Sequence, residues 1–516
     1  MSKTDDFKKH LEEGYTFKGD SIVLGAAMLD GEPVSGAQVK IPLKTLNRHG
    51  LIAGATGTGK TKTLQVLAEQ MSCKGIPTLL MDIKGDLSGI AKPGELNDHI
   101  VWRQGAIGVE YVPEGMPTEL LSISDEKGVR LRATVSEFGP ILLGKMLELN
   151  DTQEGILAIV FQYCDDNGLP LLDLKDLRKT LQYIMDEGKE EIEREYGRVS
   201  SASVGTIMRK IVALEQQGAE KFFGERSFDV KDLLFVNKKG RGQVSVIRLA
   251  DIQSKPKLFS TFMLSLLAEV YETFPEAGDS DKPKLCIFID EAHLMFNEAS
   301  DALLDQIEVI IKLIRSKGVG IYFCTQLPTD IPDEVLSQLG LKIQHALRAF
   351  TAKDRKAIKK TAENYPLSDY YETDKIITAL GIGEALVTGL NERGIPTPLA
   401  ATLLQAPKSR MDVLTPQEIN ELVDYSVLTE KYNKTIDRES AYEILTEKIK
   451  RLEEKELQEE RRKQIEKEAK VSRKKSYTTR RRGRPRKSAT EKMMGQMGNT
   501  LVREVTRGIL NIFGLR

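Results

Sequence analysis

A glycine-rich stretch at residues 51–64, LIAGATGTGKTKTL, constrains the fold more than any other part of the chain. Gly54, Gly57 and Gly59 let the backbone curl so that successive N–H groups point into one concavity, and the N-terminus of a following helix favours anions. The residues before the loop, HGLIAG, predict a short buried strand, and apolar residues at helical spacing after it predict a helix. Strand, loop and helix together predict a phosphate-binding loop (P-loop).

The pattern Gly-x-x-x-x-Gly-Lys-Thr gives individual residues of this loop separate roles. Lys60 is expected to reach the terminal phosphates of a nucleotide, and the Thr61 hydroxyl is expected to ligate Mg²⁺. The alternative is a plain Gly-rich turn, but chance produces this pattern in only about 2% of chains of this length. The predicted nucleotide-binding residues are Gly54, Ala55, Thr56, Gly57, Thr58, Gly59, Lys60, Thr61 and Lys62.

A buried strand that ends in two acids lies within residues 282–296, KPKLCIFIDEAHLMF. Asp290 is expected at the carboxyl end of this strand, beside the P-loop, where a carboxylate can hold Mg²⁺ through water. Glu291 is the candidate to orient and polarise an attacking water. A strand that ends in two acids is common by itself. Combined with a P-loop, it indicates an enzyme that hydrolyses a nucleotide and does not only bind it.

A second buried strand, within SKGVGIYFCTQLPTDIP (316–332), ends in Thr325 and Gln326. In a doubly wound sheet we expect this strand beside the acidic one. Gln326 could then hydrogen-bond the γ-phosphate or the lytic water and report its loss. The alternative is a polar strand end that caps the following turn, which Pro328 favours. Beside a P-loop, the sensor interpretation is preferred.

Two further groups of polar residues lie close to these strands in the sequence. The stretch MDIKGDL holds Asp82, Lys84 and Asp86, which we expect at the end of a strand beside the P-loop strand. Acids there could contact magnesium-bound water or a subunit interface, but turn-forming chemistry explains KGD almost as well. His49, just before the P-loop, could simply pack at the start of its strand. We assign neither group a catalytic role.

Apolar runs alternate with helical patterns along much of the chain, which predicts an α/β fold with a doubly wound, largely parallel sheet. The predicted strands are SIVLGAAML, AQVKIPL, HGLIAG, TLLMDIKGDL, QVSVIRL, KLCIFID, GIYFCTQ, IQHALRA and GEALVTG. The predicted segments are an N-terminal β segment (1–47), the first part of the nucleotide-binding core with the P-loop (48–117), a helical insertion (118–235), the second part of the core with the acidic and sensor strands (236–410), a charged helical arm (411–470), a basic disordered linker (471–490) and a C-terminal amphipathic helix (491–516).

The composition of the chain favours a cytoplasmic protein. Its 516 residues exceed one compact core, so two or three domains are expected, and its net charge of −1 argues against wholesale attraction to nucleic acid. Four scattered cysteines without metal-ligand spacing are expected to be reduced thiols. No apolar run approaches the roughly 18 residues of a membrane span. The charged N-terminus lacks the apolar region of a signal peptide.

The C-terminal residues have a different character from the core. Residues 427–470 are almost entirely charged, with opposite charges at helical spacing, which predicts a solvated helix or a coiled-coil arm. Residues 471–487 then contain nine basic residues and no acid. This stretch is expected to be disordered and to bind a polyanion such as DNA, RNA or an anionic membrane. Its RGRP sequence resembles the core of an AT-hook, a minor-groove motif.

The last stretch, 491–516, has an apolar face at near-helical spacing decorated by Arg503, Arg507 and Arg516. A contact surface within an oligomer is the preferred interpretation. A helix lying on a membrane surface is the alternative, because basic residues flank the apolar face.

Five stretches together resemble the HerA/FtsK superfamily of hexameric ATPases, and within it the HerA-like branch typified by YjgR. These stretches are HGLIAGATGTGKT, LLMDIKGDLSG, IFIDEAHLMF, LIRSKGVGIYFCTQLPTDIPDEVLSQLG and IQHALRAFTAKDRKAIK. The resemblance runs from about residue 15 to 405, and the C-terminal GQMGNTLVREVTRGILNIFG is similar to that branch as well. It implies a RecA-like core, ATP and Mg²⁺ as cofactors, and a ring, expected to be a hexamer, that translocates on DNA.

The resemblance also implies roles for single residues. Lys60 and Thr61 match the phosphate and magnesium residues, Asp290 and Glu291 match the magnesium and catalytic acids, and Gln326 matches the polar sensor. In such rings an arginine completes the site of a neighbouring subunit, because its planar guanidinium stabilises charge on phosphate oxygens. Arg348 is the first candidate, followed by Arg315 and Arg355. Lys342 departs from the pattern, since many relatives have Asn-Arg there.

Two other functions stay open from the sequence. One is an ATP-regulated scaffolding ring that serves a nuclease or effector protein. The other is a membrane-associated ATPase tethered by its basic tail. Phosphate transfer to a metabolite is less favoured, because the Asp-Glu and Thr-Gln strand ends suit transfer to water.

Overall fold

The computed structural model describes residues 2–478 apart from 254, 279, 298–300, 435 and 437. The predicted C-terminal helix 491–516 therefore lies outside the described residues. The contacts divide the chain into two units, residues 1–446 and 447–516. The described part of the second unit belongs to helix α17 (Ala441–Thr478), which starts in the first unit. Because α17 continues to Thr478, the prediction of disorder from residue 471 is wrong for 471–478.

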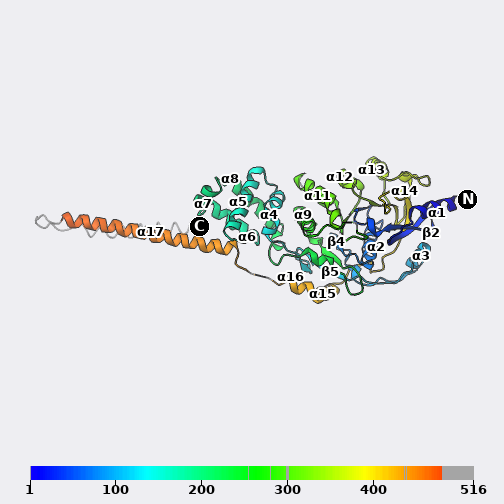
Figure 1. Cartoon of the computed structure of the whole chain (residues 1–516), viewed down its shortest axis with the longest axis horizontal. Coiled ribbons are helices and arrows are strands. Elements are labelled where there is room, and N and C mark those ends of the chain that lie inside the picture. The colour runs from blue at the N-terminus through cyan, green and yellow to red at the C-terminus, as the bar shows by residue number, and fades with distance from the viewer. Residues whose placement is uncertain are drawn as a thin grey trace. The chain divides into compact units, whose positions relative to one another are not determined.

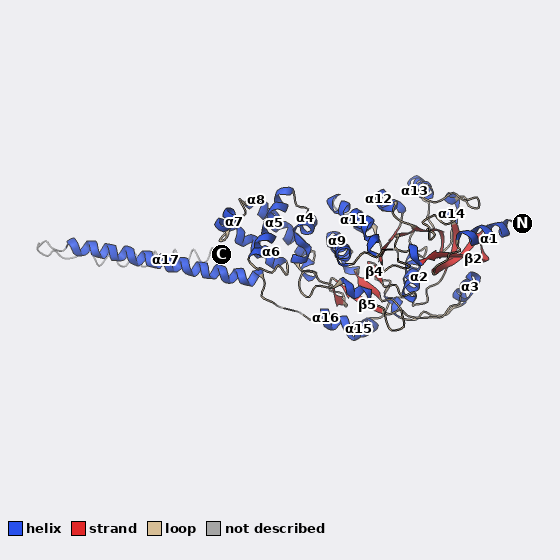
Figure 2. Cartoon of the chain, viewed as in Figure 1, coloured by secondary structure: helices blue, strands red, loops and turns tan. Residues whose placement is uncertain are grey.

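One twelve-stranded sheet organises the first unit (Figure 2). Its strand order is β2-β1-β12-β11-β10-β3-β9-β8-β4-β7-β5-β6. Neighbouring strands are parallel from β10 to β6, whereas β2, β1, β12 and β11 extend the sheet in antiparallel fashion. The strands are β1 (Ser21–Leu29), β2 (Glu32–Pro42), β3 (Gly50–Ala53), β4 (Thr78–Asp82), β5 (Thr118–Ser122), β6 (Val129–Arg130), β7 (Val244–Arg248), β8 (Leu285–Ile289), β9 (Val319–Thr325), β10 (Leu341–His345), β11 (Glu384–Thr388) and β12 (Ala400–Leu404).

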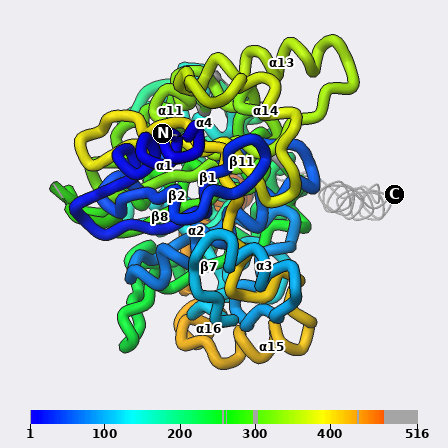
Figure 3. Tube along the Cα trace, turned by 90° about the vertical axis from the view of Figure 1, so that its right-hand side faces the viewer, coloured from blue at the N-terminus to red at the C-terminus, as the bar shows by residue number. Residues whose placement is uncertain are grey.

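Helices surround this sheet and form a separate group beyond one end of it (Figure 1). Helices α4 to α8 make up that group, while α13 and α14 lie on the opposite side of the unit from α15 and α16 (Figures 1 and 3). The helices among the described residues are α1 (Lys3–Gly14), α2 (Lys60–Cys73), α3 (Asp98–Ile107), α4 (Val135–Met146), α5 (Asp151–Asp166), α6 (Leu174–Met185), α7 (Lys189–Glu195), α8 (Ser201–Gln216), α9 (Pro256–Thr273), α10 (His293–Asn297), α11 (Asp301–Ile314), α12 (Asp333–Leu336), α13 (Ala352–Ala362), α14 (Thr373–Ala379), α15 (Pro416–Tyr425), α16 (Val427–Tyr432) and α17.

The predicted α/β fold with a largely parallel sheet is confirmed, and every predicted strand is present. Three strands, β5, β6 and β12, were not predicted, and neither was helix α1. β5 and β6 fall inside the residues predicted to be a helical insertion, so the helices of that segment begin at α4. These elements are short or weakly patterned: β6 has two residues, and α1 buries only Phe7 and Leu11. Their pairing and packing partners lie far away in the sequence.

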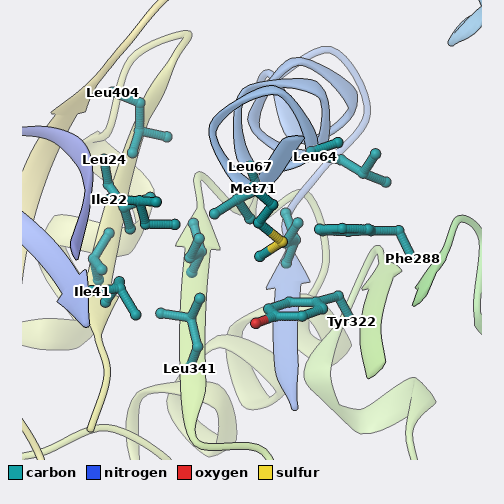
Figure 4. Packing of buried hydrophobic residues seen from close by; sticks show 14 of the residues in the cluster. Ile22, Leu24, Ile41, Leu64, Leu67, Met71, Phe288, Tyr322, Leu341 and Leu404 are labelled. Atoms are coloured by element: carbon teal, nitrogen blue, oxygen red, sulfur yellow. The ribbon is translucent and has the colours of Figure 1, made fainter. Parts of the chain in front are cut away.

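The hydrophobic core fixes the helix that follows the P-loop. Leu64, Leu67 and Met71 of α2 face the sheet, where Tyr322 and Phe288 stack with their ring centroids 4.7 Å apart (Figure 4). All five side chains are buried, and each contributes about 1.5–3 kcal/mol relative to exposure. The start of α2, and with it the P-loop, is therefore held by the rigid centre of the sheet.

No helix of the described residues is long and apolar enough to cross a membrane.

Candidate functional site

The P-loop connects β3 to α2, which is the setting predicted from the sequence. Gly54, Gly57 and Gly59 have φ values of 154°, 79° and 109°, a region that L-residues rarely adopt. A Cβ on Gly54 would lie 2.5 Å from the Cβ of His345, so the loop also needs glycine for close approach. These three positions explain why the turn is glycine-rich.

Lys60 is held inside its own loop. Its Nζ donates hydrogen bonds to the carbonyls of Gly54 (2.7 Å) and Ala55 (3.1 Å). The side chain is buried, and this desolvation lowers the pKa of Lys60. The ammonium group thus lies over the curled backbone whose N–H groups are expected to take phosphate. Thr61, the next residue, is half-buried in the first turn of α2.

Asp290 follows β8, and β9 separates β8 from β3 in the sheet. Its side chain is fully buried, and burial raises the pKa of its carboxyl group. Among the described residues, neither Oδ atom accepts a hydrogen bond. The Lys84 ammonium lies 3.8 Å from Oδ2, and the lone pairs left free on this buried carboxylate fit the predicted role of a magnesium residue.

Glu291 has two basic side chains next to its carboxylate. Its Oε1 contacts the ammonium of Lys84, and its Oε2 lies 3.1 Å from Nδ1 of His293. Lys84 also lies 3.8 Å from Oδ2 of Asp290. The backbone of Glu291 has φ 45°, which is unusual for a residue with a side chain. His293 was not singled out in the sequence, although it stands two positions after Glu291.

Thr325 and Gln326 at the end of β9 differ in their contacts. Thr325 donates a hydrogen bond from Oγ1 to Asp330 (2.7 Å), which also accepts one from the Leu327 N–H (2.8 Å). Thr325 therefore caps the following turn, as the alternative interpretation held. Gln326 is exposed, and its backbone carbonyl accepts a hydrogen bond from the Gly54 N–H (3.1 Å). This bond places Gln326 directly beside the P-loop.

The strand that carries Asp82 is not beside the P-loop strand, so that prediction is wrong. β9 and β8 lie between β3 and β4. Strand order depends on long-range pairing and is not encoded locally. Asp82 accepts hydrogen bonds from the N–H groups of Gly85 (2.8 Å), Asp86 (3.1 Å) and Leu87 (3.1 Å), and burial raises its pKa to about 7. Its role is to build the turn that carries Lys84.

Lys62 points away from the P-loop. Its ammonium donates to the carbonyl of Met411, in the segment that follows β12. Gln65 and Glu69, further along α2, bind the same segment: Gln65 donates to the Ser409 hydroxyl (2.6 Å), and Glu69 accepts from the Ser409 N–H (2.9 Å). If Lys62 binds nucleotide, it does so through its backbone.

Of the arginines that could complete the nucleotide site of a neighbouring subunit, Arg348 and Arg315 lie at opposite ends of the parallel strands. Arg348 follows β10 and donates to the carbonyls of Thr378 (3.0 Å) and Leu380 (3.4 Å) at the end of α14. Arg315 lies in the 3₁₀ helix Arg315–Lys317, before the amino end of β9. Arg355 is exposed on α13.

His49 packs at the start of β3, in agreement with its structural interpretation. Its ring is buried, its Nδ1 accepts a hydrogen bond from the Ile321 N–H (3.0 Å), and its Nε2 lies 2.9 Å from the Ile311 carbonyl. Accepting at Nδ1 and donating at Nε2 requires the neutral ring. Burial lowers the pKa of His49 from 6.5 to about 4.

We therefore expect acid to destabilise the fold through His49. The unfolded chain binds a proton near pH 6.5, whereas the folded chain does so only near pH 4, so stability falls as pH drops through that window. The loss is about 3 kcal/mol. His49→Asn, which tolerates the φ of 56° at this position, removes the titration. Denaturant unfolding of both full chains at pH 7 and pH 4.5 should show a shallower pH dependence for the variant. Parallel pH profiles would contradict the assignment.

Comparison with known proteins shows the family of the chain. The family model for the helicase HerA-like C-terminal region matches residues 28–515. The chain belongs to the HerA-like helicase family. The resemblance inferred from the motifs is therefore confirmed at the level of the family.

Two curated relatives of this HerA-like chain are DNA double-strand break repair helicases. HerA of Sulfolobus acidocaldarius is 24% identical over 369 residues, which are 70% of this chain and 66% of that protein. HerA of Sulfurisphaera tokodaii is 24% identical over 360 residues, which are 69% and 65% of the two chains. The HerA-like chain thus spans slightly less than two thirds of the length of these relatives.

A solved structure with a similar fold is the plasmid coupling protein TrwB. Its complexes with a non-hydrolysable ATP analogue and with ADP and Mg²⁺ both superpose with a TM-score of 0.50 at 15% identity. The match covers 79% of this chain and 95% and 94% of the TrwB chains. The likeness is one of fold, and it confirms the RecA-like P-loop core.

Proposed function

We propose that this HerA-like protein is a Mg²⁺-dependent ATP hydrolase that assembles into a ring, expected to be a hexamer, and moves along DNA in the cytoplasm. The observation that carries the proposal is the acidic pair beside the P-loop. Asp290 is buried without a hydrogen bond among the described residues, and Glu291 is paired with Lys84 through Oε1. A buried, oriented pair of acids next to a phosphate-binding loop suits hydrolysis of a bound nucleotide.

The chain's own residues divide this work between them. The backbone N–H groups of the P-loop and the ammonium of Lys60 bind and neutralise the phosphates. Thr61 and Asp290 hold Mg²⁺, which polarises the phosphoryl oxygens when it is bound. Glu291 orients the attacking water and takes its proton, and Gln326 lies where it can contact the γ-phosphate. Each of these roles is a proposal that rests on position in the sheet.

Movement along DNA is supported by the family and by the two relatives, both DNA double-strand break repair helicases. The test is steady-state ATP hydrolysis by the full chain with and without duplex DNA. We expect duplex DNA to stimulate hydrolysis several-fold. Equal rates would contradict the DNA motor and favour an ATP-regulated ring that serves a nuclease or effector partner.

The positions of the two arginines relative to the parallel strands favour Arg315 over Arg348 as the residue that completes the nucleotide site of a neighbouring subunit. A closed ring is built from heterologous contacts, so one face of a subunit meets a different face of the next. An arginine that reaches the neighbour's nucleotide should therefore lie away from the carboxyl ends of the strands, where the P-loop of its own subunit lies. Arg315 lies before the amino end of β9, whereas Arg348 follows the carboxyl end of β10 and is held by α14.

The surroundings of Arg315 suit a phosphate ligand. Arg315 and Arg48 together line two adjoining clefts with volumes of about 340 and 450 Å³. Neither arginine forms an ion pair with another described residue. Burial and the nearby Arg48 lower the pKa of Arg315, which indicates uncompensated positive charge. An anion from another subunit would relieve this repulsion.

We expect Arg315→Ala and Glu291→Gln to complement each other in mixed rings. Each variant alone should be inactive, because every site lacks one essential group. In a mixed ring, an Arg315→Ala subunit with an intact Glu291 can meet a neighbour with an intact Arg315. ATP hydrolysis by rings co-expressed with two affinity tags should therefore recover to a measurable fraction of the wild-type rate.

Mixed rings of Arg348→Ala and Glu291→Gln show which of the two arginines, Arg315 or Arg348, completes the site of a neighbouring subunit. If Arg315→Ala alone stays fully active, and Arg348→Ala is inactive but recovers when mixed with Glu291→Gln, then Arg348 acts in trans and the assignment of Arg315 is wrong.

A further inference from the structure

Lys84 is aimed at the acidic pair by a turn that is fixed in place. Asp82 ends β4 and binds the three N–H groups of the turn that carries Lys84. β4 pairs directly with β8, with Met81 opposite Ile289. The turn after β4 and the acids after β8 therefore emerge side by side. The carboxylate of Asp82 is buried, so the turn has a rigid base.

The contacts of Lys84 join the two acids. Its ammonium contacts Oε1 of Glu291 and lies 3.8 Å from Oδ2 of Asp290. The side chains of Asp290 and Glu291 are 1% and 9% exposed, whereas that of Lys84 is 34% exposed. Two adjacent buried carboxylates repel each other, and a single ammonium between them offsets part of that repulsion. Lys84 is the ion-pair partner of Asp290 among the described residues.

The same contacts restrict the carboxylate of Glu291. Lys84 contacts Oε1, so rotation of the carboxylate would break this ion pair, whereas Oε2 lies 3.1 Å from Nδ1 of His293 without a hydrogen bond. A base that must align a water is sensitive to such restraint, because a displacement of about 1 Å can cost on the order of 100-fold in rate. Without Lys84, only the contact with His293 would remain.

We propose that Lys84 is a positioning residue with two opposed effects, an inference that rests on the proposed ATP hydrolysis. It holds Glu291 in the orientation that aligns the attacking water, and so raises turnover. It also places a positive charge beside Asp290, and so weakens the binding of a divalent cation there. Lys84 therefore sets the cation concentration at which the site becomes active.

The test compares Lys84→Met, which keeps the length of the side chain but removes its charge, with Lys84→Arg, which keeps the charge. For Lys84→Met we expect kcat to fall about 10- to 100-fold with little change in the KM for ATP. In the presence of a non-hydrolysable ATP analogue, Mn²⁺ should bind several-fold more tightly to Lys84→Met, as measured by the free Mn²⁺ signal in electron paramagnetic resonance. Lys84→Arg should keep the wild-type affinity for Mn²⁺ and part of the turnover.

Lys127→Ala is the matched control, because it removes another lysine–carboxylate pair, the exposed contact with Asp424 (3.0 Å). Lys127→Ala should change neither kcat nor the affinity for Mn²⁺. The proposal would be overturned if Lys84→Met kept the wild-type kcat. It would also be overturned if the affinity of Lys84→Met for Mn²⁺ were equal to or weaker than that of the wild type. If the wild-type chain itself fails to hydrolyse ATP, the proposed function is wrong, while Mn²⁺ binding still decides whether Lys84 opposes the cation. If Lys84→Met does not fold, loss of both turnover and Mn²⁺ affinity in Lys84→Arg would overturn the proposal.

Discussion

Replacing Glu291 with glutamine is expected to lower the turnover of ATP by about 10²- to 10⁴-fold while nucleotide binding is kept. The amide has nearly the shape of the carboxylate but cannot accept the proton of the attacking water. It also carries no charge to attract Lys84, which contacts Oε1. Phosphate release at saturating ATP measures the first effect, and equilibrium binding of a fluorescent ATP analogue measures the second.

Glu334→Gln provides the control for this experiment. Glu334 is an exposed acid on α12, and the same chemical change there should leave turnover within about two-fold of wild type. If Glu291→Gln hydrolysed ATP as fast as the control, another group would have to activate the water. The assignment of the acidic pair would then be wrong.

Lys60→Ala is expected to weaken ATP binding by about 10- to 100-fold, since a charge-assisted hydrogen bond contributes roughly 1.5–3 kcal/mol. The ammonium lies over the loop through the carbonyls of Gly54 and Ala55, so its removal takes away the positive charge nearest to the predicted phosphates. Binding of the fluorescent analogue measures this loss. Turnover at saturating ATP should fall as well, because Lys60 also stabilises charge in the transition state.

Lys74→Ala is the matched control on the same helix. Lys74 follows the C-terminal end of α2 and forms an ion pair with Asp20 (2.7 Å), far along the helix from the P-loop. It should leave the affinity for the analogue unchanged. Equal affinities of Lys60→Ala and Lys74→Ala would show that Lys60 does not contact the phosphates.

Much of the candidate site could be predicted because its signals are local. The glycines at 54, 57 and 59 are required by positive φ values within one loop, and Asp290 and Glu291 directly follow one apolar strand. The partners of these residues could not be predicted in the same way. The sequence explains Lys84 equally well as part of a turn and gives no signal for His293, because their contacts depend on which strand lies next to β8.

The position of each strand in the sheet was the least predictable feature. The apolar runs identify β4, β8 and β9 as strands, but no local pattern states that β9 separates β3 from β8, or that β4 pairs with β8. Arg315 and Arg348 lie at opposite ends of the strands because β9 and β10 run in the same direction, with Arg315 before β9 and Arg348 after β10. Short elements such as β6 exist only because a neighbouring strand offers hydrogen bonds.

The sequence by itself determined the P-loop and the acidic pair, because each lies within one short stretch, and the parallel α/β class, because strand and helix patterns alternate along the chain. Only the tertiary structure decided which side chains surround Glu291, which arginine faces away from the P-loop, and that Thr325 caps a turn. These features arise when segments distant in the chain pack together. The free energy of that packing comes from long-range burial and pairing, which a local stretch of sequence does not contain.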